Sequence, residues 1–298
     1  MSAVRVTRPV AGSGTGAASA TWLHRLRAGS GYGALWAWTL LCLAPLALTL
    51  LSSVKSNTEI FASQLSLPTV VRLENYGRAW AGTSSDGSLP SYLFNSVVVA
   101  VVAIVLGVGS GTLAAYALAR WRGRSSDALY LWLLILLTVP LLVTMIPIFG
   151  MTSALGLRNN LVALGAIYAA FIVPTAAVLM RAFFQDFPNE LVEAARLDGC
   201  SEWQAFRKVV LPMSYGAIAG VSILALIWVW GELLFAIVLL TKPEAKTLPV
   251  GLLSFRGQYF TDLGVLFAGL VIATGPILLA YLVFQRRVTK GVTLGAFR

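Results

Sequence analysis

Apolar residues are gathered along this chain into six long runs that are separated by shorter polar stretches. A bilayer core is about 30 Å thick, so a helix that crosses it needs about 20 mainly apolar residues. All six runs meet this requirement, and none alternates apolar with polar residues as membrane β-strands do. The pattern predicts an all-α integral membrane protein with six transmembrane helices. We expect them at Tyr32–Val54, Tyr92–Ala119, Ala128–Phe149, Leu161–Met180, Gly216–Leu240 and Leu263–Phe284.

A regular strip of small residues marks one side of the second run. Gly107, Gly111, Ala115 and Ala119 recur every four residues, which places them on one face of a helix. Small residues let two helix backbones approach closely, and close packing drives helix association in lipid. We therefore expect another helix to pack tightly along this strip.

The composition agrees with a membrane protein. Of the 298 residues, 58% are hydrophobic and 11% are charged, whereas soluble domains are about 45–50% apolar and about 25% charged. So few charges cannot cover a water-facing surface, which excludes an ordinary soluble enzyme. Disorder is excluded as well, because disordered chains are poor in apolar residues.

The net charge of +10 is explained by membrane topology, so no nucleic-acid partner is expected. Cytoplasmic segments next to spans carry an excess of Lys and Arg. With the N-terminus inside, these segments hold 15 of the 22 basic residues. Arg120, Arg122 and Arg124 in one short loop are the strongest single indication. We predict that both termini lie in the cytoplasm.

The chain divides into a tail and one membrane domain. Residues 1–30 are rich in Gly, Ala, Ser and Arg and contain no apolar run, so we expect a flexible cytoplasmic tail; a signal peptide would need such a run and a cleavage site. Residues 31–298 form the six-span domain, with its core at 91–286.

The least apolar stretch of this core, residues 181–215, lies between the fourth and fifth spans. Pro188 fits the first turn of a helix that Asp186 would cap. Gly199 would end that helix after Leu197, because glycine readily adopts the positive φ of a helix stop.

A second helix is expected directly after this stop. Ser201 and Gln204 have the spacing of a capping box that opens a helix. Its residues Trp203, Phe206 and Val210 would share one face, and Pro212 would end it. The stretch is thus predicted to form a helix-turn-helix elbow at the cytoplasmic surface.

The first helix of this elbow has features of a docking element. The small side chains of Ala194 and Ala195 would project little from the helix, so that the walls of a cleft can approach it closely. Glu193 and Asp198 offer negative charges to a basic partner. The alternative is an amphipathic helix that lies on the membrane without a protein partner. Such helices favour a polar face rich in Lys and Arg, whereas this one is acidic.

The elbow resembles a known family element. It is similar to the EAA loop of type I ABC importer permeases in three features: Glu193-Ala194-Ala195, then Gly199, and a Leu211-Pro212 ending. Further phrases resemble the carbohydrate-uptake (maltose-type) permeases, and with them the resemblance runs from about Leu40 to Gly295. These phrases are PNELVEAARLDGCSEWQAFRKVVLP, AAYALARWRGR, LGLRNN, WGELLFAIVLL and KTLPVGL.

The resemblance implies the type I ABC importer permease fold and a place in the bacterial inner or plasma membrane. It also implies alternating access with a second homologous permease subunit, an extracytoplasmic solute-binding protein and two cytoplasmic ATPase subunits that use ATP and Mg²⁺. The substrate implied is a sugar or oligosaccharide. An ABC permease for a polyamine, phosphate or amino acid, or an ion-coupled secondary transporter, remains as an alternative. The residues expected to couple the permease to the ATPases are Glu193, Ala194, Ala195, Asp198, Gly199, Leu211 and Pro212.

The chain shows no catalytic constellation of its own. No G-x-x-x-x-G-K-[ST] phosphate loop occurs, so ATP must be hydrolysed by another subunit. The single histidine, His24, lies in the tail, and Cys42 and Cys200 are far apart. We expect no enzyme activity, no bound cofactor and no metal.

Glu232 is the one formal charge within the six predicted spans. An ionisable residue inside a span suggests a substrate path, and Trp228 and Trp230 would offer stacking faces to a sugar. Alternatively, Glu232 pairs with a polar group of a neighbouring helix or subunit, and the tryptophans belong to an interfacial belt. The sequence leaves both possibilities open.

Overall fold

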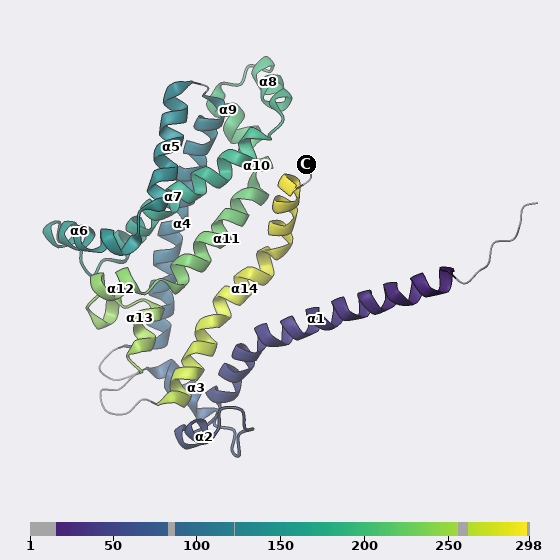
Figure 1. Ribbon diagram of the computed structural model, residues 1–298. Coiled ribbons are helices and arrows are strands. Elements are labelled where there is room, and N and C mark those ends of the chain that lie inside the picture. Colours follow the sequence, from purple (N-terminus) through teal and green to yellow (C-terminus); the bar gives the residue numbers. More distant parts are fainter. Residues whose placement is uncertain (1–15, 83–86, 122, 256–261, 297–298) are drawn as a thin grey trace, which may run out of the picture.

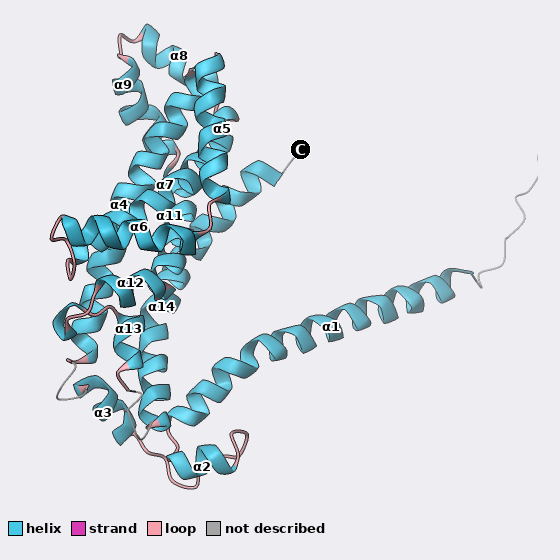
Figure 2. Ribbon diagram, turned by 60° about the vertical axis from the view of Figure 1, so that its left-hand side comes forward, coloured by secondary structure: helices cyan, strands magenta, loops and turns pink. Residues whose placement is uncertain are grey.

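The computed structural model describes residues 16–82, 87–121, 123–255 and 262–296. Every secondary-structure element within these ranges is helical, as Figure 2 shows. Four helices are long and apolar enough to cross a membrane alone, and up to six spans result if each of two bent helix pairs counts as one. The all-α membrane architecture is therefore confirmed, and the expected six spans agree with the higher count.

Four long helices and a series of shorter ones make up the described part of the chain. The long helices are α1 (Gly16–Ser53), α4 (Leu89–Arg120), α7 (Leu161–Gln185) and α14 (Leu263–Ala296). The shorter helices are α2 (Asn57–Ala62), α3 (Glu74–Ala81), α5 (Arg124–Thr138), α6 (Leu141–Ala154), α8 (Asn189–Leu197), α9 (Glu202–Ala205), the π-helix η1 (Phe206–Val210), α10 (Leu211–Met213), α11 (Tyr215–Gly231), α12 (Leu234–Leu239), the 3₁₀-helix η2 (Pro243–Ala245) and α13 (Leu248–Leu253).

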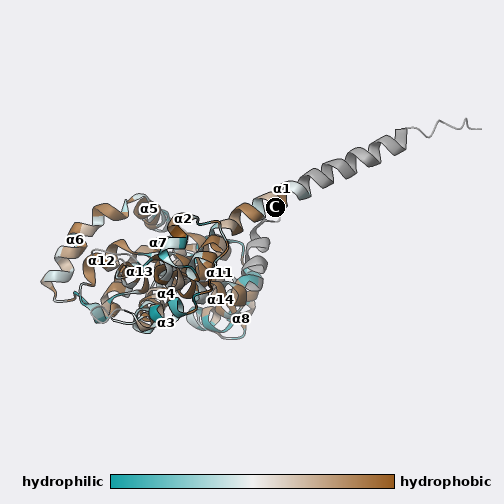
Figure 3. Cartoon of the chain, turned by 90° about the horizontal axis from the view of Figure 1, so that it is seen from below, coloured by the Kyte–Doolittle hydropathy of each residue, from teal (hydrophilic) through white to brown (hydrophobic). Residues whose placement is uncertain are grey.

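The helices α4, α7, α11 and α14 run along one bundle (Figure 1). The helices α8 and α9 lie at one end of it, and α2 and α3 lie at the opposite end. Helix α1 contacts the bundle near its own C-terminal end and extends away from it, and Figure 3 shows apolar colouring on the part of α1 nearest the bundle. It begins at Gly16, within the segment expected to be a tail, and residues 1–15 lie outside the described ranges.

The third predicted span, Ala128–Phe149, is not one straight helix. Helices α5 and α6 meet at an angle of 96°, and Val139 and Pro140 between them have extended backbone. The ring of Pro140 disfavours helical geometry at the residue before it, and the missing N–H cannot continue a helix. As a result α6 turns away from the bundle (Figure 1).

The fifth predicted span, Gly216–Leu240, is also interrupted. Helix α11 ends at Gly231, Glu232 has extended backbone with ψ of 123°, and α12 begins at Leu234. At its other end, α11 meets the run of α9 to α10 at 72°. The apolar run is continuous in the sequence, but the helix is not, because the side chain of Glu232 replaces the helical bonding at the break, as described below.

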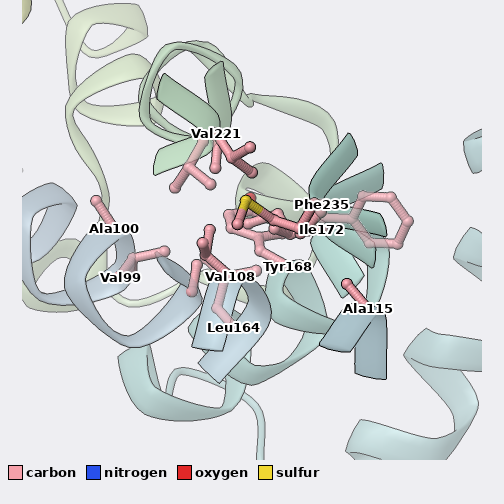
Figure 4. Packing of buried hydrophobic residues seen from close by; sticks show 14 of the residues in the cluster. Val99, Ala100, Val108, Ala115, Leu164, Tyr168, Ile172, Val221 and Phe235 are labelled. Carbon is pink, nitrogen blue, oxygen red and sulfur yellow. The ribbon is translucent and has the colours of Figure 1, made fainter. Parts of the chain in front are cut away.

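The predicted close packing along the second span is confirmed. A Cβ atom built on Gly111 would lie 2.6 Å from the Cβ of Ala176, and one on Gly107 would lie 2.8 Å from the Cβ of Ile172. Both neighbours belong to α7, so α4 and α7 pack almost backbone to backbone. The large side chains of the core converge beside this contact, including Tyr168 of α7 and Val221 of α11 (Figure 4).

This contact supports a stability prediction. Replacing Gly111 by alanine is expected to destabilise the bundle by about 1–3 kcal/mol, because the added methyl group overfills a tight interface. The matched control is Gly109→Ala, since a Cβ at Gly109 meets nothing within 4 Å and alanine favours the helix. Thermal unfolding of the detergent-solubilised variants measures the difference. Equal melting temperatures for the two variants would contradict the predicted tight packing.

Candidate coupling site and transport path

The first helix of the elbow, α8, ends as the sequence predicts. Gly199 has φ of +83°, its N–H donates to the carbonyl of Arg196, and the N–H of Cys200 donates to the carbonyl of Ala195, each at 3.0 Å. These two bonds form a Schellman stop, which requires the left-handed backbone that glycine tolerates best. The chain therefore turns sharply after α8.

The predicted beginning of α8 is wrong. Pro188 precedes the helix as its N-cap residue, and no side chain caps the first turn. Asp186, expected to be the cap, instead ends α7. The extended backbone of Pro188, with ψ of 117°, separates the two helices.

The second helix opens with the predicted capping box. The Oγ of Ser201 accepts from the N–H of Gln204 at 3.3 Å, and the Oε1 of Gln204 accepts from the N–H of Ser201 at 2.9 Å. Of the three residues expected on one face, Phe206 and Val210 are buried, whereas Trp203 is exposed and its ring lies 5.5 Å from that of Phe206.

Pro212 does not end this helix. The N–H of Leu211 donates to the carbonyl of Phe206, which is the i→i−5 bond of a π-helix. Such a bulge accommodates the missing N–H of Pro212. The helical run continues to Met213, and the chain bends at the buried Ser214. Leu211 and Pro212 thus lie at the bend before α11, apart from the tip formed by α8 (Figure 1).

The structure separates the two alanines of the EAA sequence. Ala195 is buried beside Val192 on the inner face of α8, whereas Ala194 is exposed together with Glu193 and Asp198. Successive helix residues point about 100° apart, so Ala194 and Ala195 cannot both serve an outer cleft. The small side chain of Ala195 lets α8 pack closely against the rest of the elbow. That of Ala194 projects little from the outer face.

Sequence reasoning missed the most exposed apolar residue of α8. The side chain of Leu197 is 88% exposed and stands at the last position of the helix. Glu193 and Asp198 are exposed beside it, so its exposure is not explained by lipid-facing surroundings. No sequence pattern indicated this exposure, because the packing of Val192 and Ala195 decides which face of α8 points outward.

A charged cluster joins α8, α9 and the end of α4. The carboxylate of Glu202 accepts from the hydroxyl of Tyr116 at 2.6 Å and from the Nε of Arg196 at 3.0 Å. The Nε of Arg120 lies 3.7 Å from the same carboxylate. The hydrogen bond to Glu202 and its negative charge raise the pKa of Arg196 above its ordinary value. No sequence pattern indicated this cluster.

At the other end of the bundle, Glu232 binds the start of α12. Its carboxylate accepts from the N–H groups of Leu234 at 2.8 Å, Phe235 at 3.0 Å and Ala236 at 3.3 Å. It also accepts from the hydroxyl of Tyr168 on α7. A carboxylate at a helix N-terminus satisfies N–H groups that have no partner within the helix.

Two neighbouring segments are held in a similar way. The Oδ1 of Asn159 accepts from the N–H groups of Thr241 at 2.6 Å and Lys242 at 2.8 Å. The Nδ2 of Asn95 donates to the carbonyls of Glu244 and Lys246 at 2.8 and 2.9 Å. Side chains of α4 and of the loop before α7 thus satisfy the irregular backbone that follows α12.

The two tryptophans predicted beside Glu232 point to different places. The ring of Trp228 packs edge-on against Tyr168 at 5.4 Å and Phe171 at 6.2 Å, both of α7. The Nε1 of Trp230 donates to the carbonyl of Ala273 on α14 at 3.1 Å. The structure therefore does not bring both rings together around one site.

Trp228 lines a large apolar groove of about 1070 Å³ between α5, α6, α7 and α11. The wall formed by α6 exists because that helix turns away at Pro140. Most of the lining is aliphatic, with hydroxyl groups supplied by Thr144, Thr152 and Thr175. Within the described residues, no group of three or more His, Cys, Asp or Glu side chains could hold a metal ion.

Comparison with known proteins identifies the family. Residues 103–294 match the family described as "Binding-protein-dependent transport system inner membrane component". The chain belongs to this family. It is therefore a multi-pass membrane subunit of a binding-protein-dependent transport system, that is, an ABC transporter permease.

Curated relatives of this permease cover most of its length. It is 35% identical over 263 residues to the diacetylchitobiose uptake system permease protein NgcG of Streptomyces coelicolor, covering 88% of this chain and 86% of the relative. It is 33% identical to the trehalose transport system permease protein SugB of Mycobacterium tuberculosis, covering 78% and 84%. It is 30% identical to the arabinooligosaccharides transport system permease protein AraQ of Bacillus subtilis, covering 87% and 92%.

A solved structure shares the fold of this permease. A chain from a bacterial ABC transporter involved in the import of the acidic polysaccharide alginate superposes with a TM-score of 0.75 at 24% identity. The match covers 88% of this chain and 96% of the other. The expected ABC importer permease fold is thereby confirmed.

Proposed function

We propose that this permease carries a sugar or oligosaccharide into a bacterial cell, through the cytoplasmic membrane, as one subunit of an ABC importer. The substrate class is supported by the printed names of several relatives, which concern diacetylchitobiose, trehalose and arabino-oligosaccharides. Its partners are a second homologous permease, two ATPase subunits and an extracytoplasmic solute-binding protein. ATP and Mg²⁺ are used by the ATPases.

The observation that carries the proposal is the outer face of α8. Ala194 and Leu197 project from a short helix whose inner face is anchored by the buried Val192 and Ala195. A rigid helix with a low, partly apolar surface can dock in a cleft of an ATPase and transmit its movement. Glu193 and Asp198 flank this surface and offer charges to basic groups of the partner.

The groove beside Trp228 forms half of the transport path in this proposal. Its lining comes from α5, α6, α7 and α11 of this chain, and the second permease completes the path. Closure of the ATPases moves α8, and the helices of the bundle then change between inward-open and outward-open arrangements. The aromatic face of Trp228 and the threonine hydroxyls are suited to the apolar faces and hydroxyl groups of a sugar.

Site-specific cross-linking tests the docking face. A photoreactive phenylalanine derivative replaces Leu197 or Ala194 in the assembled transporter, and Ala195, on the buried face, is the matched control. Cross-linking to the ATPase is expected from Leu197 and Ala194, with a yield that changes when ATP binds, and little from Ala195. If neither exposed position yields a product with the ATPase, α8 is not the docking element.

Uptake measurements test the substrate class. Proteoliposomes that contain the complete importer, together with its binding protein, should accumulate a labelled oligosaccharide when ATP is inside. Unlabelled polyamine, phosphate or amino acid in excess should leave that accumulation unchanged. Accumulation of one of these solutes in place of any sugar would reject the proposed substrate class and keep the permease assignment.

A further inference from the structure

Glu202 holds three helices together at the cytoplasmic end of the permease. It is the first residue of α9. Its Oε1 accepts from Tyr116 of α4, and its Oε2 accepts from the Nε of Arg196 of α8. Arg120, the last residue of α4, lies 3.7 Å from the same carboxylate. One side chain therefore links α4, α8 and α9.

The same cluster fixes α8 at both of its ends. Near its C-terminal end, Arg196 binds Glu202 through two nitrogen atoms. At its first residue, the Oδ1 of Asn189 accepts from the Nη1 of Arg120 at 2.8 Å. These two attachments are seven residues apart on one helix, a rise of about 10 Å. Two such attachments prevent α8 from pivoting about either of them.

The attachment points on α4 lie in a closely packed part of the bundle. The ring of Tyr116 lies 5.6 Å from that of Phe184 and 4.6 Å from that of Phe206. Helix α4 in turn packs closely against α7 at Gly107 and Gly111, which face Ile172 and Ala176. A force on α8 that passes through Glu202 thus reaches α4 and α7, and Tyr168 and Trp228 lie further along this path beside the groove.

We propose that Glu202 is a positioning residue for energy coupling, which holds α8 rigidly on the last turn of α4 so that displacement of α8 moves the bundle. This inference rests on the proposed docking of an ATPase on α8. The cluster is not needed to keep the elbow folded, because Val192, Ala195, Phe206 and Val210 are buried there. Ion pairs as exposed as Arg196 and Glu202, with 53% and 43% of their side chains accessible, add little to stability.

The test measures the amount of solute imported for each ATP hydrolysed by the complete transporter in proteoliposomes. In Glu202→Ala this ratio is expected to fall about threefold or more, a change within the range that substitutions in coupling networks produce. ATP hydrolysis should continue. Glu190→Ala removes an exposed carboxylate of α8 and should leave the ratio unchanged.

A double-mutant cycle tests whether the effect passes through Tyr116. Tyr116→Phe keeps the ring contacts and removes the hydroxyl, so it should lower the ratio by a smaller factor. The double variant Tyr116→Phe with Glu202→Ala should have the same ratio as Glu202→Ala alone. Once the carboxylate of Glu202 is removed, the hydroxyl of Tyr116 has no hydrogen bond to it left to lose. Multiplicative effects would overturn the role of this hydrogen bond.

Cross-linking from position 197 separates this inference from the proposed function. If Glu202→Ala keeps the cross-link to the ATPase while the ratio falls, the positioning role is supported. Two results for Glu202→Ala would overturn the positioning role. One is an unchanged ratio with the cross-link present. The other is loss of the cross-link together with a parallel fall in import and hydrolysis. Absence of the cross-link in the unmodified permease would instead reject the docking proposal itself.

Discussion

Replacing Gly199 by valine is expected to reduce solute uptake by about tenfold or more while the permease still inserts in the membrane. Gly199 has φ of +83°, and a left-handed backbone costs an L-residue about 1–2 kcal/mol, with β-branched residues among the worst. A difference of about 1.4 kcal/mol corresponds to a factor of ten in an equilibrium constant. The strain is relieved by moving α8 relative to α9, which displaces the docking face.

Two features make this prediction specific to the backbone. A Cβ atom at Gly199 would meet nothing within 4 Å, so no side-chain collision accompanies the change. Gly199→Asn is the matched control, because asparagine tolerates positive φ, and its uptake should stay within about twofold of the unmodified protein. Uptake is measured in cells with the amount of permease in the membrane determined in parallel. Normal uptake by the valine variant would show that the turn does not position the coupling helix.

Replacing Glu232 by alanine is expected to destabilise the permease by about 2–4 kcal/mol. Its carboxylate accepts from three N–H groups of α12 and from the hydroxyl of Tyr168. Phe235 and Ala236 are buried, so their N–H groups would be left without a partner or nearby water. Each unsatisfied buried group costs about 1–3 kcal/mol. Thermal unfolding of the purified protein in detergent measures this loss of stability.

This experiment also distinguishes the two possible roles of Glu232. If the carboxylate holds α12 in place, Glu232→Ala lowers the melting temperature, and the apparent KM for solute changes little in the protein that remains folded. If it binds solute in the path, the KM rises and the melting temperature is unchanged. Glu244→Ala is the control, because the side chain of Glu244 is exposed in the same outer segment. Given its four hydrogen bonds, we expect the structural result.

Local features of the elbow were predictable because they depend on residues close together in sequence. The stop at Gly199 and the capping box of Ser201 and Gln204 each involve backbone and side chains within a few positions. The same holds for the small-residue strip, since helical periodicity places Gly107 and Gly111 on one face. The capping role assigned to Asp186 failed because α7 continues almost to that residue.

The breaks in the third and fifth apolar runs could not be located from hydropathy. Pro140 lies within an apolar stretch long enough to span, and many transmembrane helices tolerate a proline. Whether the chain kinks slightly or turns by 96° depends on what α6 packs against. Similarly, Glu232 interrupts a helix because Tyr168, distant in sequence, supplies a further donor for its carboxylate.

By itself, the sequence determined that this protein is a helical membrane protein, where most spans lie and that an EAA-type elbow stands between the fourth and fifth runs. These properties follow from the thickness of the bilayer and from short-range periodicity. Only the tertiary structure decided that Ala194 and Leu197 face outward while Ala195 faces inward, that Trp228 and Trp230 point to different helices, and that Glu202 ties α8 to α4. These depend on contacts between residues up to 86 positions apart, which no local pattern records.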